Sequence, residues 1–171
     1  MRVLIADDHE IVRDALKLVV ANLASNVTIM ECSNYSEAVA LAEQDGSPDL
    51  AVLDLRMPGM TGPASVGEFH RQFPQIPAVV LSGQYRRQDI VEAFRNGAAG
   101  FIPKTLNSAA MVNALRLVLA GGKYIPTDLL PDGVGGPVDS ETPDEFQTRG
   151  YPNGDLTARE EEVLATLWSY S

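Results

Sequence analysis

Five short, largely apolar runs alternate along the first part of the chain with five longer segments in which apolar residues recur at helical spacing. A short run that is apolar throughout suits a strand buried on both faces, as in a parallel sheet covered by helices. The predicted strands are 3–6, 27–30, 50–53, 78–81 and 98–102. The predicted helices are 9–24, 34–45, 61–73, 86–96 and 107–120. This alternation predicts an α/β fold in which right-handed crossovers place helices on both faces of one parallel sheet.

Polar side chains follow four of the five predicted strands at the point where each strand ends. They are Asp7 and Asp8, Asp54, Ser82 and Lys104. Ligands of open parallel sheets bind outside the carboxyl ends of the strands, where the strand order reverses. The common order for five such units, 2-1-3-4-5, is a doubly wound, flavodoxin-like sheet in which the first and third strands are adjacent. We therefore expect Asp7, Asp8 and Asp54 to meet in one crevice.

Three carboxylates in one crevice repel one another, so they take up protons or bind a hard cation. Mg²⁺ fits such a site, because it prefers oxygen ligands and keeps open positions for water and phosphate oxygens. Lys104 contributes a point charge and Ser82 a hydroxyl donor, both of which suit a phosphoryl group. Asp54 is then the candidate nucleophile, since a carboxylate can form an aspartyl phosphate. The sequence shows no set of partners around His9 or His70, so neither is expected to bind a metal.

The acidic charge of the chain is concentrated in its last part. Residues 1–125 carry 13 acidic and 11 basic side chains, whereas residues 126–171 carry 10 acidic and 2 basic ones. An acidic segment repels the phosphate backbone, so the chain as given is expected to bind DNA poorly. The single cysteine, Cys32, excludes an internal disulfide and is expected to be a buried thiol near a strand end. No apolar run approaches bilayer length, and we expect a soluble cytoplasmic protein without a membrane partner.

A change of composition after the last predicted helix indicates the domain boundaries. Residues 121–155 contain seven glycines and five prolines with almost no apolar periodicity, as is typical of a mobile linker. Thr157 and Glu160 form a capping box at the start of a further helix. That helix has an apolar stripe that it cannot bury alone, so it either docks on the first domain or begins a second one. The predicted division is a first domain at 1–122, a flexible acidic linker at 123–155 and a partial helix at 156–171.

Four motifs stand at the predicted strand ends: IADDH at 5–9, LDLRMPG at 53–59, LSG at 81–83 and GAAGFIPK at 97–104. In this order they resemble the receiver domain of bacterial two-component response regulators. The segment LTAREEEVL at 156–164 is similar to the opening of a LuxR-type helix-turn-helix DNA-binding domain, which is expected to be incomplete here. Together these resemblances point to the NarL/FixJ class of transcription regulators, which sensor histidine kinases phosphorylate.

The resemblance implies a role for each residue at the strand ends. Asp54 is expected to be the phosphoacceptor, and Lys104 is expected to pair with the phosphate. Mg²⁺ is expected to be bound by Asp8, Asp54 and the backbone carbonyl of Arg56, with Asp7 acting through a water molecule. Beyond its own phosphorylation and slow dephosphorylation, the chain is not expected to be an enzyme.

The resemblance also implies a switch, with Ser82 as its hydroxyl and Phe101 as its aromatic ring. Two positions depart from the common family pattern. Thr105 follows Lys104 where many receivers have a proline, which argues against the cis peptide often found there. Phe101 stands where many receivers have a tyrosine, so a hydroxyl contact in the active state is impossible, although the ring can still repack.

Two other functions compete with a phosphorylation switch. A Mg²⁺-dependent phosphatase with an aspartyl nucleophile typically needs a second aspartate two residues later, and Arg56 occupies that position. Steady hydrolysis of a phosphate ester would favour this alternative. The second alternative is a degenerate receiver that acts only as a binding module. Failure of the chain to become phosphorylated in Mg²⁺ would favour this alternative. The complete set of acidic residues and lysine favours the switch.

Self-association is predicted from the first and last helices of the receiver. The predicted helices 9–24 and 107–120 both carry more apolar residues than one buried face requires, and the expected strand order places them on the same side of the sheet. Exposed apolar patches often mark partner surfaces. We therefore expect a homodimer through these helices, unless the final helix covers the patch in a monomer.

Overall fold

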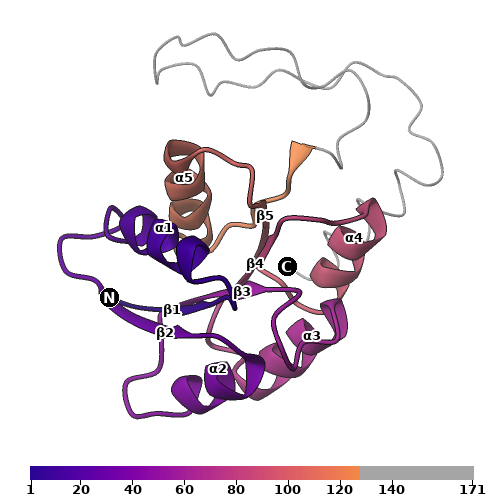
Figure 1. Ribbon diagram of the computed structural model, residues 1–171, viewed down its shortest axis with the longest axis horizontal. Coiled ribbons are helices and arrows are strands. Elements are labelled where there is room, and N and C mark those ends of the chain that lie inside the picture. Colours follow the sequence, from indigo (N-terminus) through magenta and orange to yellow (C-terminus); the bar gives the residue numbers. More distant parts are fainter. Residues whose placement is uncertain (128–171) are drawn as a thin grey trace, which may run out of the picture. The chain divides into compact units, whose positions relative to one another are not determined.

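The computed structural model describes residues 1–127, and these contain one parallel sheet with the strand order β2-β1-β3-β4-β5 (Figure 1). The strands are β1 (Arg2–Ala6), β2 (Thr28–Cys32), β3 (Leu50–Asp54), β4 (Ala78–Ser82) and β5 (Gly100–Pro103). The register places Ala6 opposite both Cys32 and Leu53, and Asp54 opposite Leu81. The predicted doubly wound, five-stranded sheet and its order are confirmed.

Helices connect the strands and begin at residues that suit a helix start. They are α1 (Glu10–Val20), α2 (Tyr35–Ala42), α3 (Pro63–Gln72), α4 (Arg87–Arg95) and α5 (Ser108–Leu119). The Asn34 side chain caps α2 by accepting a hydrogen bond from the backbone N–H of Glu37 at 2.9 Å. Asn107 caps α5 in the same way, through the N–H of Ala110 at 2.9 Å. Such caps satisfy N–H groups that the first helical turn leaves free.

The helices cover both faces of the sheet, with α1 and α5 on one face and α2, α3 and α4 on the other (Figure 1). Successive side chains of a strand point to opposite faces, so the sheet contributes to two apolar layers. The layer under α1 and α5 includes Leu16, Val20 and Leu115. The opposite layer includes Met57 and Phe69. Because interiors of this kind are closely packed, the strand ends form a firm platform for the side chains that follow them.

The first helix is shorter than the predicted range of 9–24. It ends at Val20, and the next residues form a tighter turn. The backbone N–H groups of Asn22 and Leu23 donate to the carbonyls of Val19 and Val20, three residues back, at 3.1 and 3.0 Å. Turns of this type commonly finish α-helices, and apolar periodicity alone does not reveal them.

Cys32 ends β2, which extends beyond the predicted strand 27–30 because Cys32 pairs with Ala6. The side chain is buried, as predicted. Burial raises the pKa of the Cys32 thiol to about 11, so the thiol is protonated at neutral pH.

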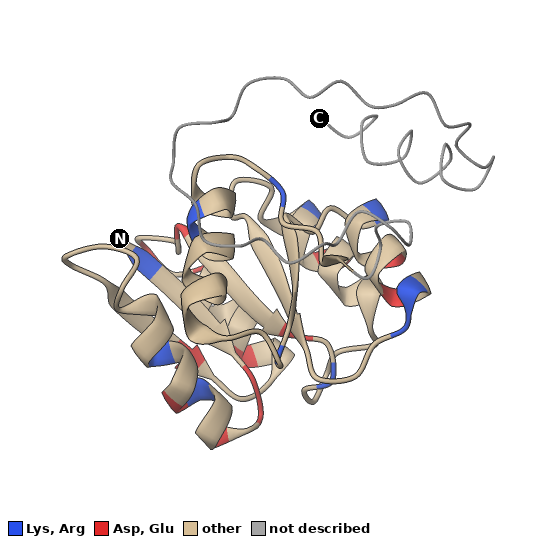
Figure 2. Ribbon diagram, turned by 90° about the horizontal axis from the view of Figure 1, so that it is seen from above, with Lys and Arg blue, Asp and Glu red and all other residues tan. Residues whose placement is uncertain are grey.

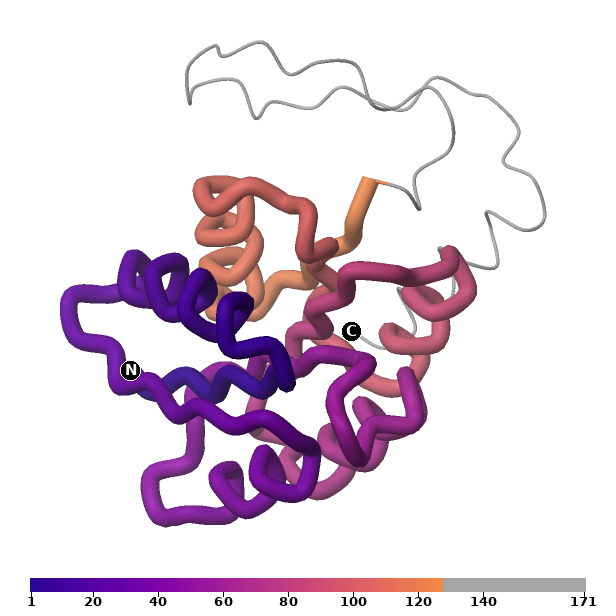
Figure 3. The backbone as a smooth tube through the Cα atoms, viewed as in Figure 1, coloured from indigo at the N-terminus to yellow at the C-terminus, as the bar shows by residue number. Residues whose placement is uncertain are grey.

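The chain continues to pair with the sheet after α5. The N–H of Phe101 donates to the carbonyl of Tyr124 at 3.0 Å, and the orange end of the described chain lies beside β5 in Figure 3. This compact unit runs from Met1 to Pro126. The predicted linker 123–155 lies outside the described residues from 128 onward, and so does the whole predicted helix 156–171.

Charged residues of both signs are interspersed along the described ribbon (Figure 2). On α1, for example, Nζ of Lys17 lies 2.8 Å from Asp14 and 3.0 Å from Glu31. Such exposed ion pairs contribute little to stability. Within residues 1–127, no helix combines the length and the apolar character that crossing a bilayer requires.

Candidate functional site

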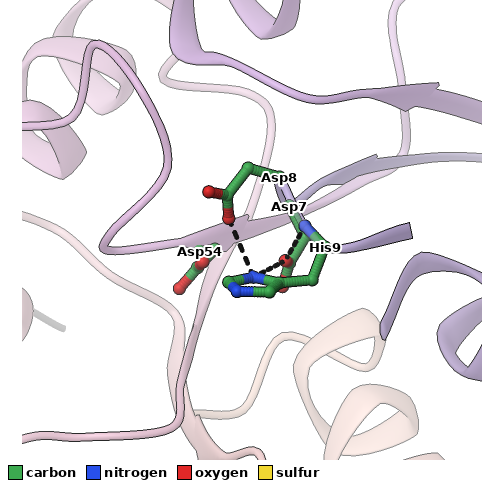
Figure 4. Close-up of side chains that lie close together, drawn as sticks. All are labelled: Asp7, Asp8, His9 and Asp54. Carbon is green, nitrogen blue, oxygen red and sulfur yellow. Dashed lines mark hydrogen bonds and ion pairs between the residues drawn. The ribbon is translucent and has the colours of Figure 1, made fainter. Parts of the chain in front are cut away.

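Two buried carboxylates meet at the carboxyl edge of the sheet. Asp7 directly follows β1, and Asp54 is the last residue of β3. These strands are neighbours, with Ala6 opposite Leu53, so both side chains emerge at the same place. The exposed fractions of Asp7 and Asp54 are 0% and 2%. Asp8 is exposed and lies beside them (Figure 4), and we call Asp7, Asp8 and Asp54 the acidic cluster.

Lys104 reaches the acidic cluster from the loop after β5. Its Nζ lies 2.7 Å from Oδ2 of Asp7 and 3.2 Å from Oδ2 of Asp54. The backbone N–H of Lys104 donates to the carbonyl of Ser82 at 2.9 Å, which holds the start of this loop against the end of β4. The peptide bond between Lys104 and Thr105 is trans. One ammonium group therefore neutralises part of the charge of two carboxylates that are shielded from water.

These charges shift one another's ionisation. Burial, followed by the negative charge of Asp7, raises the pKa of the Asp54 carboxyl above its ordinary value. Lys104 opposes this rise, as does the backbone N–H of Arg56, which donates to Oδ1 of Asp54 at 3.3 Å. Burial lowers the pKa of Lys104, but the carboxylates of Asp7 and Asp54 outweigh burial, so the pKa is raised overall. Lys104 is thus charged at neutral pH.

The buried oxygens of the acidic cluster share one cation. Oδ2 of Asp7 and Oδ2 of Asp54 are buried, and both are paired with the ammonium of Lys104 and accept no other hydrogen bond. Asp7, Asp8, His9 and Asp54 each offer one ligand atom, and these four atoms lie within 4.8 Å of one another. A divalent cation would balance the negative charge that one ammonium leaves, so the residues present fit a metal ion.

The other two predicted site residues, Ser82 and Phe101, lie on β4 and β5. Ser82 is fully buried, and its Oγ donates to the carbonyl of Gln84 at 2.8 Å. Phe101 is fully buried as well, and its ring packs edge-on against Tyr85 with the ring centroids 5.2 Å apart. The Ser82 hydroxyl therefore bonds within its own loop, while the ring of Phe101 is part of the core.

His9 is the residue of the site for which the sequence offered no role. Its Nδ1 lies 2.9 Å from Oδ1 of Asp8 and 3.1 Å from Oδ1 of Asp7 (Figure 4). The fold places its ring against two carboxylates, a contact that the sequence did not reveal, while the expectation that His9 does not bind a metal stays a prediction. The only signal in the sequence was its position directly after the aspartate pair.

Comparison with known proteins agrees with this geometry. The family described as response regulator receiver domain matches residues 3–116. The glycerol metabolism activator of Pseudomonas putida is 34% identical over 129 residues, which cover 75% of this chain and 58% of that protein. The nitrate/nitrite response regulator protein NarL of Escherichia coli K12 is 32% identical over 130 residues, which cover 75% of this chain and 59% of that protein.

Solved structures show the same relationship. A LuxR family DNA-binding response regulator from Silicibacter pomeroyi superposes with a TM-score of 0.67 and 28% identity, covering 75% of this chain and 98% of that one. This chain spans less than two thirds of the length of the two relatives above. The matching family consists of signalling receivers rather than of enzymes with a substrate of their own. The chain belongs to the response regulator receiver family, and it is similar to NarL and to a LuxR family response regulator.

Proposed function

We propose that Asp54 accepts a phosphoryl group from the phosphohistidine of a sensor histidine kinase, and that this event controls a DNA-binding output domain which regulates transcription. The observation that carries the proposal is the position of Asp54. It is a buried carboxylate at a strand end, with Asp7 beside it and Lys104 at 3.2 Å. The deciding test is phosphate uptake from a small phosphodonor in Mg²⁺, with Asp54→Asn as the variant.

In the proposed step, a carboxylate oxygen of Asp54 forms a bond to phosphorus while the bond from phosphorus to the imidazole nitrogen of the donor breaks. The leaving imidazole takes up a proton, so the charges balance. Lys104 already lies between Asp7 and Asp54, where its ammonium can pair with an oxygen of the incoming phosphoryl group. Mg²⁺, when bound, supplies positive charge that draws the phosphoryl oxygens into place.

The proposed ligands of Mg²⁺ are the carboxylates of Asp8 and Asp54 and the backbone carbonyl of Arg56, with Asp7 acting through water. The closeness of the carboxylates of Asp7, Asp8 and Asp54 supports this set, because one ammonium balances only part of their charge. Asp8 is the exposed member, so it lies on the side from which an ion and its waters enter. Ser82 and Phe101 are the proposed switch residues. Ser82 is the last residue of β4 and lies opposite Pro103, which precedes Lys104, and Phe101 lies on β5 opposite Val80.

Removal of the exposed carboxylate is expected to weaken Mg²⁺ binding without unfolding the chain. Asp8→Ala deletes one oxygen ligand, and Mg²⁺ affinity measured by calorimetry should fall at least about tenfold. The neighbouring exposed acid outside the acidic cluster provides the control, and Glu10→Ala should change the affinity by less than about twofold. An unchanged affinity in Asp8→Ala would remove Asp8 from the ligand set.

We also propose a homodimer through α1 and α5. These helices lie together on one face of the sheet and leave large apolar side chains exposed, with Leu18 exposed by 73% and Leu117 by 45%. Val118, the residue after Leu117, is part of the core. Exposed apolar side chains on two neighbouring helices support a partner surface there.

The exposed leucine of α1 provides the sharper test of the dimer. Leu18→Glu introduces a charge on the proposed surface without touching the core, so sedimentation should show a dimer dissociation constant at least about tenfold higher than in the wild type. Ala64→Glu, at an exposed position of α3 on the other face, is the matched control and should leave the constant unchanged. A wild-type chain that stays monomeric at high concentration after phosphorylation would contradict the proposal.

The output function concerns residues that the structure does not describe. The chain as given is proposed not to bind DNA with sequence specificity, because its residues 126–171 carry 10 acidic and 2 basic side chains. The likeness of 156–164 to a helix-turn-helix opening supports a DNA-binding output domain. A sub-micromolar, sequence-specific affinity of this chain for DNA would contradict the prediction that the chain as given does not bind DNA specifically.

A further inference from the structure

The loop between β3 and α3, residues 55–62, carries two backbone groups of the proposed site, both on Arg56. The N–H of Arg56 donates to Oδ1 of Asp54 at 3.3 Å, and its carbonyl is a proposed ligand of Mg²⁺. Asp54 is the last residue of β3 and is held by the sheet. The position of the Arg56 carbonyl therefore depends on how the rest of this loop is fixed.

Tyr35, the first residue of α2, holds the middle of the loop through its main chain. Its backbone N–H donates to the carbonyl of Pro58 at 2.9 Å. Gly59 lies against the same residue, since a Cβ added to Gly59 would come within 3.1 Å of Cβ of Tyr35. The φ of Gly59 is +85°, which glycine adopts without strain. Arg56 therefore lies in a short segment whose two ends, Asp54 and Pro58, are both held.

The side chain of Tyr35 holds the far end of the loop. Its hydroxyl donates to the carbonyl of Ser65 at 3.1 Å, in the first turn of α3. Ser65 is buried, and its Oγ accepts a hydrogen bond from the backbone N–H of Thr61 at 2.9 Å. The ring of Tyr35 packs against the apolar layer that α2 and α3 cover. One residue thus spans the loop, from the carbonyl of Pro58 to the carbonyl of Ser65.

We infer that Tyr35 is a positioning residue for phosphoryl uptake by Asp54, because it fixes the backbone of Arg56 and thereby sets how tightly the site binds Mg²⁺. The inference rests on the metal site of the proposed function and adds a residue outside its ligand set. A ligand that is fixed before the ion binds loses little conformational freedom on binding. Groups that orient metal ligands commonly change metal affinity by tenfold or more when they are replaced.

Two variants of the full chain remove the contacts of Tyr35 in steps, and calorimetry measures the dissociation constant of Mg²⁺. Tyr35→Phe removes only the hydroxyl and should raise this constant about three- to tenfold, as expected for one lost hydrogen bond. Tyr35→Pro also removes the N–H and the ring, and should raise the constant at least about tenfold. Proline suits the first position of a helix, the backbone of Asn34 is extended, and the Asn34 side chain still caps α2.

Each variant has a matched control. Ser108→Pro places proline at the first position of α5, which Asn107 caps as Asn34 caps α2. Tyr124→Phe removes the hydroxyl of a tyrosine that pairs with Gly100 at the start of β5, the end of the strand remote from Lys104. Both controls should bind Mg²⁺ within about twofold of the wild type. Circular dichroism verifies that each variant is folded, and urea unfolding in a chelating buffer measures its stability without metal.

A Mg²⁺ affinity within about twofold of the wild type in either Tyr35 variant would overturn the inference, because Tyr35 would then act on stability alone. Equal losses of affinity in Tyr35→Pro and Ser108→Pro would also overturn it. In saturating Mg²⁺, both Tyr35 variants should take up phosphate within about threefold of the wild-type rate, since Asp54 and Lys104 are unchanged. The proposed function fails in a different way, namely if Asp54→Asn takes up phosphate as the wild type does, whatever the Mg²⁺ affinities of the Tyr35 variants.

Discussion

In Mg²⁺ and a small phosphodonor such as phosphoramidate, the wild-type chain should take up one phosphoryl group, and Asp54→Asn should take up phosphate at least about a hundredfold more slowly. The physical reason is that a carboxamide is a far weaker nucleophile than a carboxylate. Asn and Asp have nearly the same shape, so the buried position at the end of β3 stays filled. Intact-protein mass measurement over time provides the readout.

A control variant and a chemical test of the product show whether the label is on Asp54. Asp45→Asn changes an exposed aspartate outside the acidic cluster and should be phosphorylated at the wild-type rate. An aspartyl phosphate is an acyl phosphate, so hydroxylamine should remove the label from the wild type. Wild-type labelling of Asp54→Asn, or a label that resists hydroxylamine, would move the phosphoacceptor away from Asp54.

The second large effect is expected when the ammonium group of the site is removed. Without metal at pH 7, Lys104→Met should lower the free energy of unfolding by about 2–4 kcal/mol, because Asp7 and Asp54 would remain buried without their cation. The side chain of Lys104 is 18% exposed, so some water can compensate, which places the loss below that of a fully buried pair. Chemical denaturation in a chelating buffer measures the difference.

The pH dependence of this difference has a definite sign. The pKa of Lys104 is raised in the folded protein above its ordinary value of 10.5, because the attraction of Asp7 and Asp54 outweighs burial. The stability that Lys104 contributes is therefore fully present below pH 10.5 and is lost as the pH rises through the folded-state pKa. The gap between wild type and Lys104→Met should be constant near neutral pH and should shrink above that value.

Two further measurements, on a control lysine variant and in saturating Mg²⁺, distinguish the loss of the Lys104 ion pairs from the loss of any positive charge. Lys123→Met removes an exposed lysine outside the site and should change stability by less than about 0.5 kcal/mol. Saturating Mg²⁺ should stabilise Lys104→Met more than the wild type, since the metal then provides the missing positive charge. If both lysine variants were equally stable without metal, the ion pairs of Lys104 would not contribute to the free energy of unfolding.

The sequence by itself determined the α/β class, the strand order and the presence of polar residues at the strand ends. Runs such as 50–53 and 78–81 are apolar throughout, and only a sheet covered on both faces buries every residue of such a run. The ends of helices and strands were predicted less accurately than their presence. The turn that ends α1 at Val20 and the pairing that extends β2 to Cys32 depend on backbone hydrogen bonds that apolar periodicity does not reveal.

Only the tertiary structure decided how the site residues touch one another. Lys104 and Asp7 are far apart in the chain, and their distance of 2.7 Å depends on the order in which the strands pack. The approach of His9 to Asp8 and the hydrogen bond from Ser82 to Gln84 depend on the path of loops, which no apolar period encodes. Residue types limit the chemistry that is possible, whereas distances of a few ångströms are set by packing, and those distances decide which carboxylate oxygens pair with Lys104.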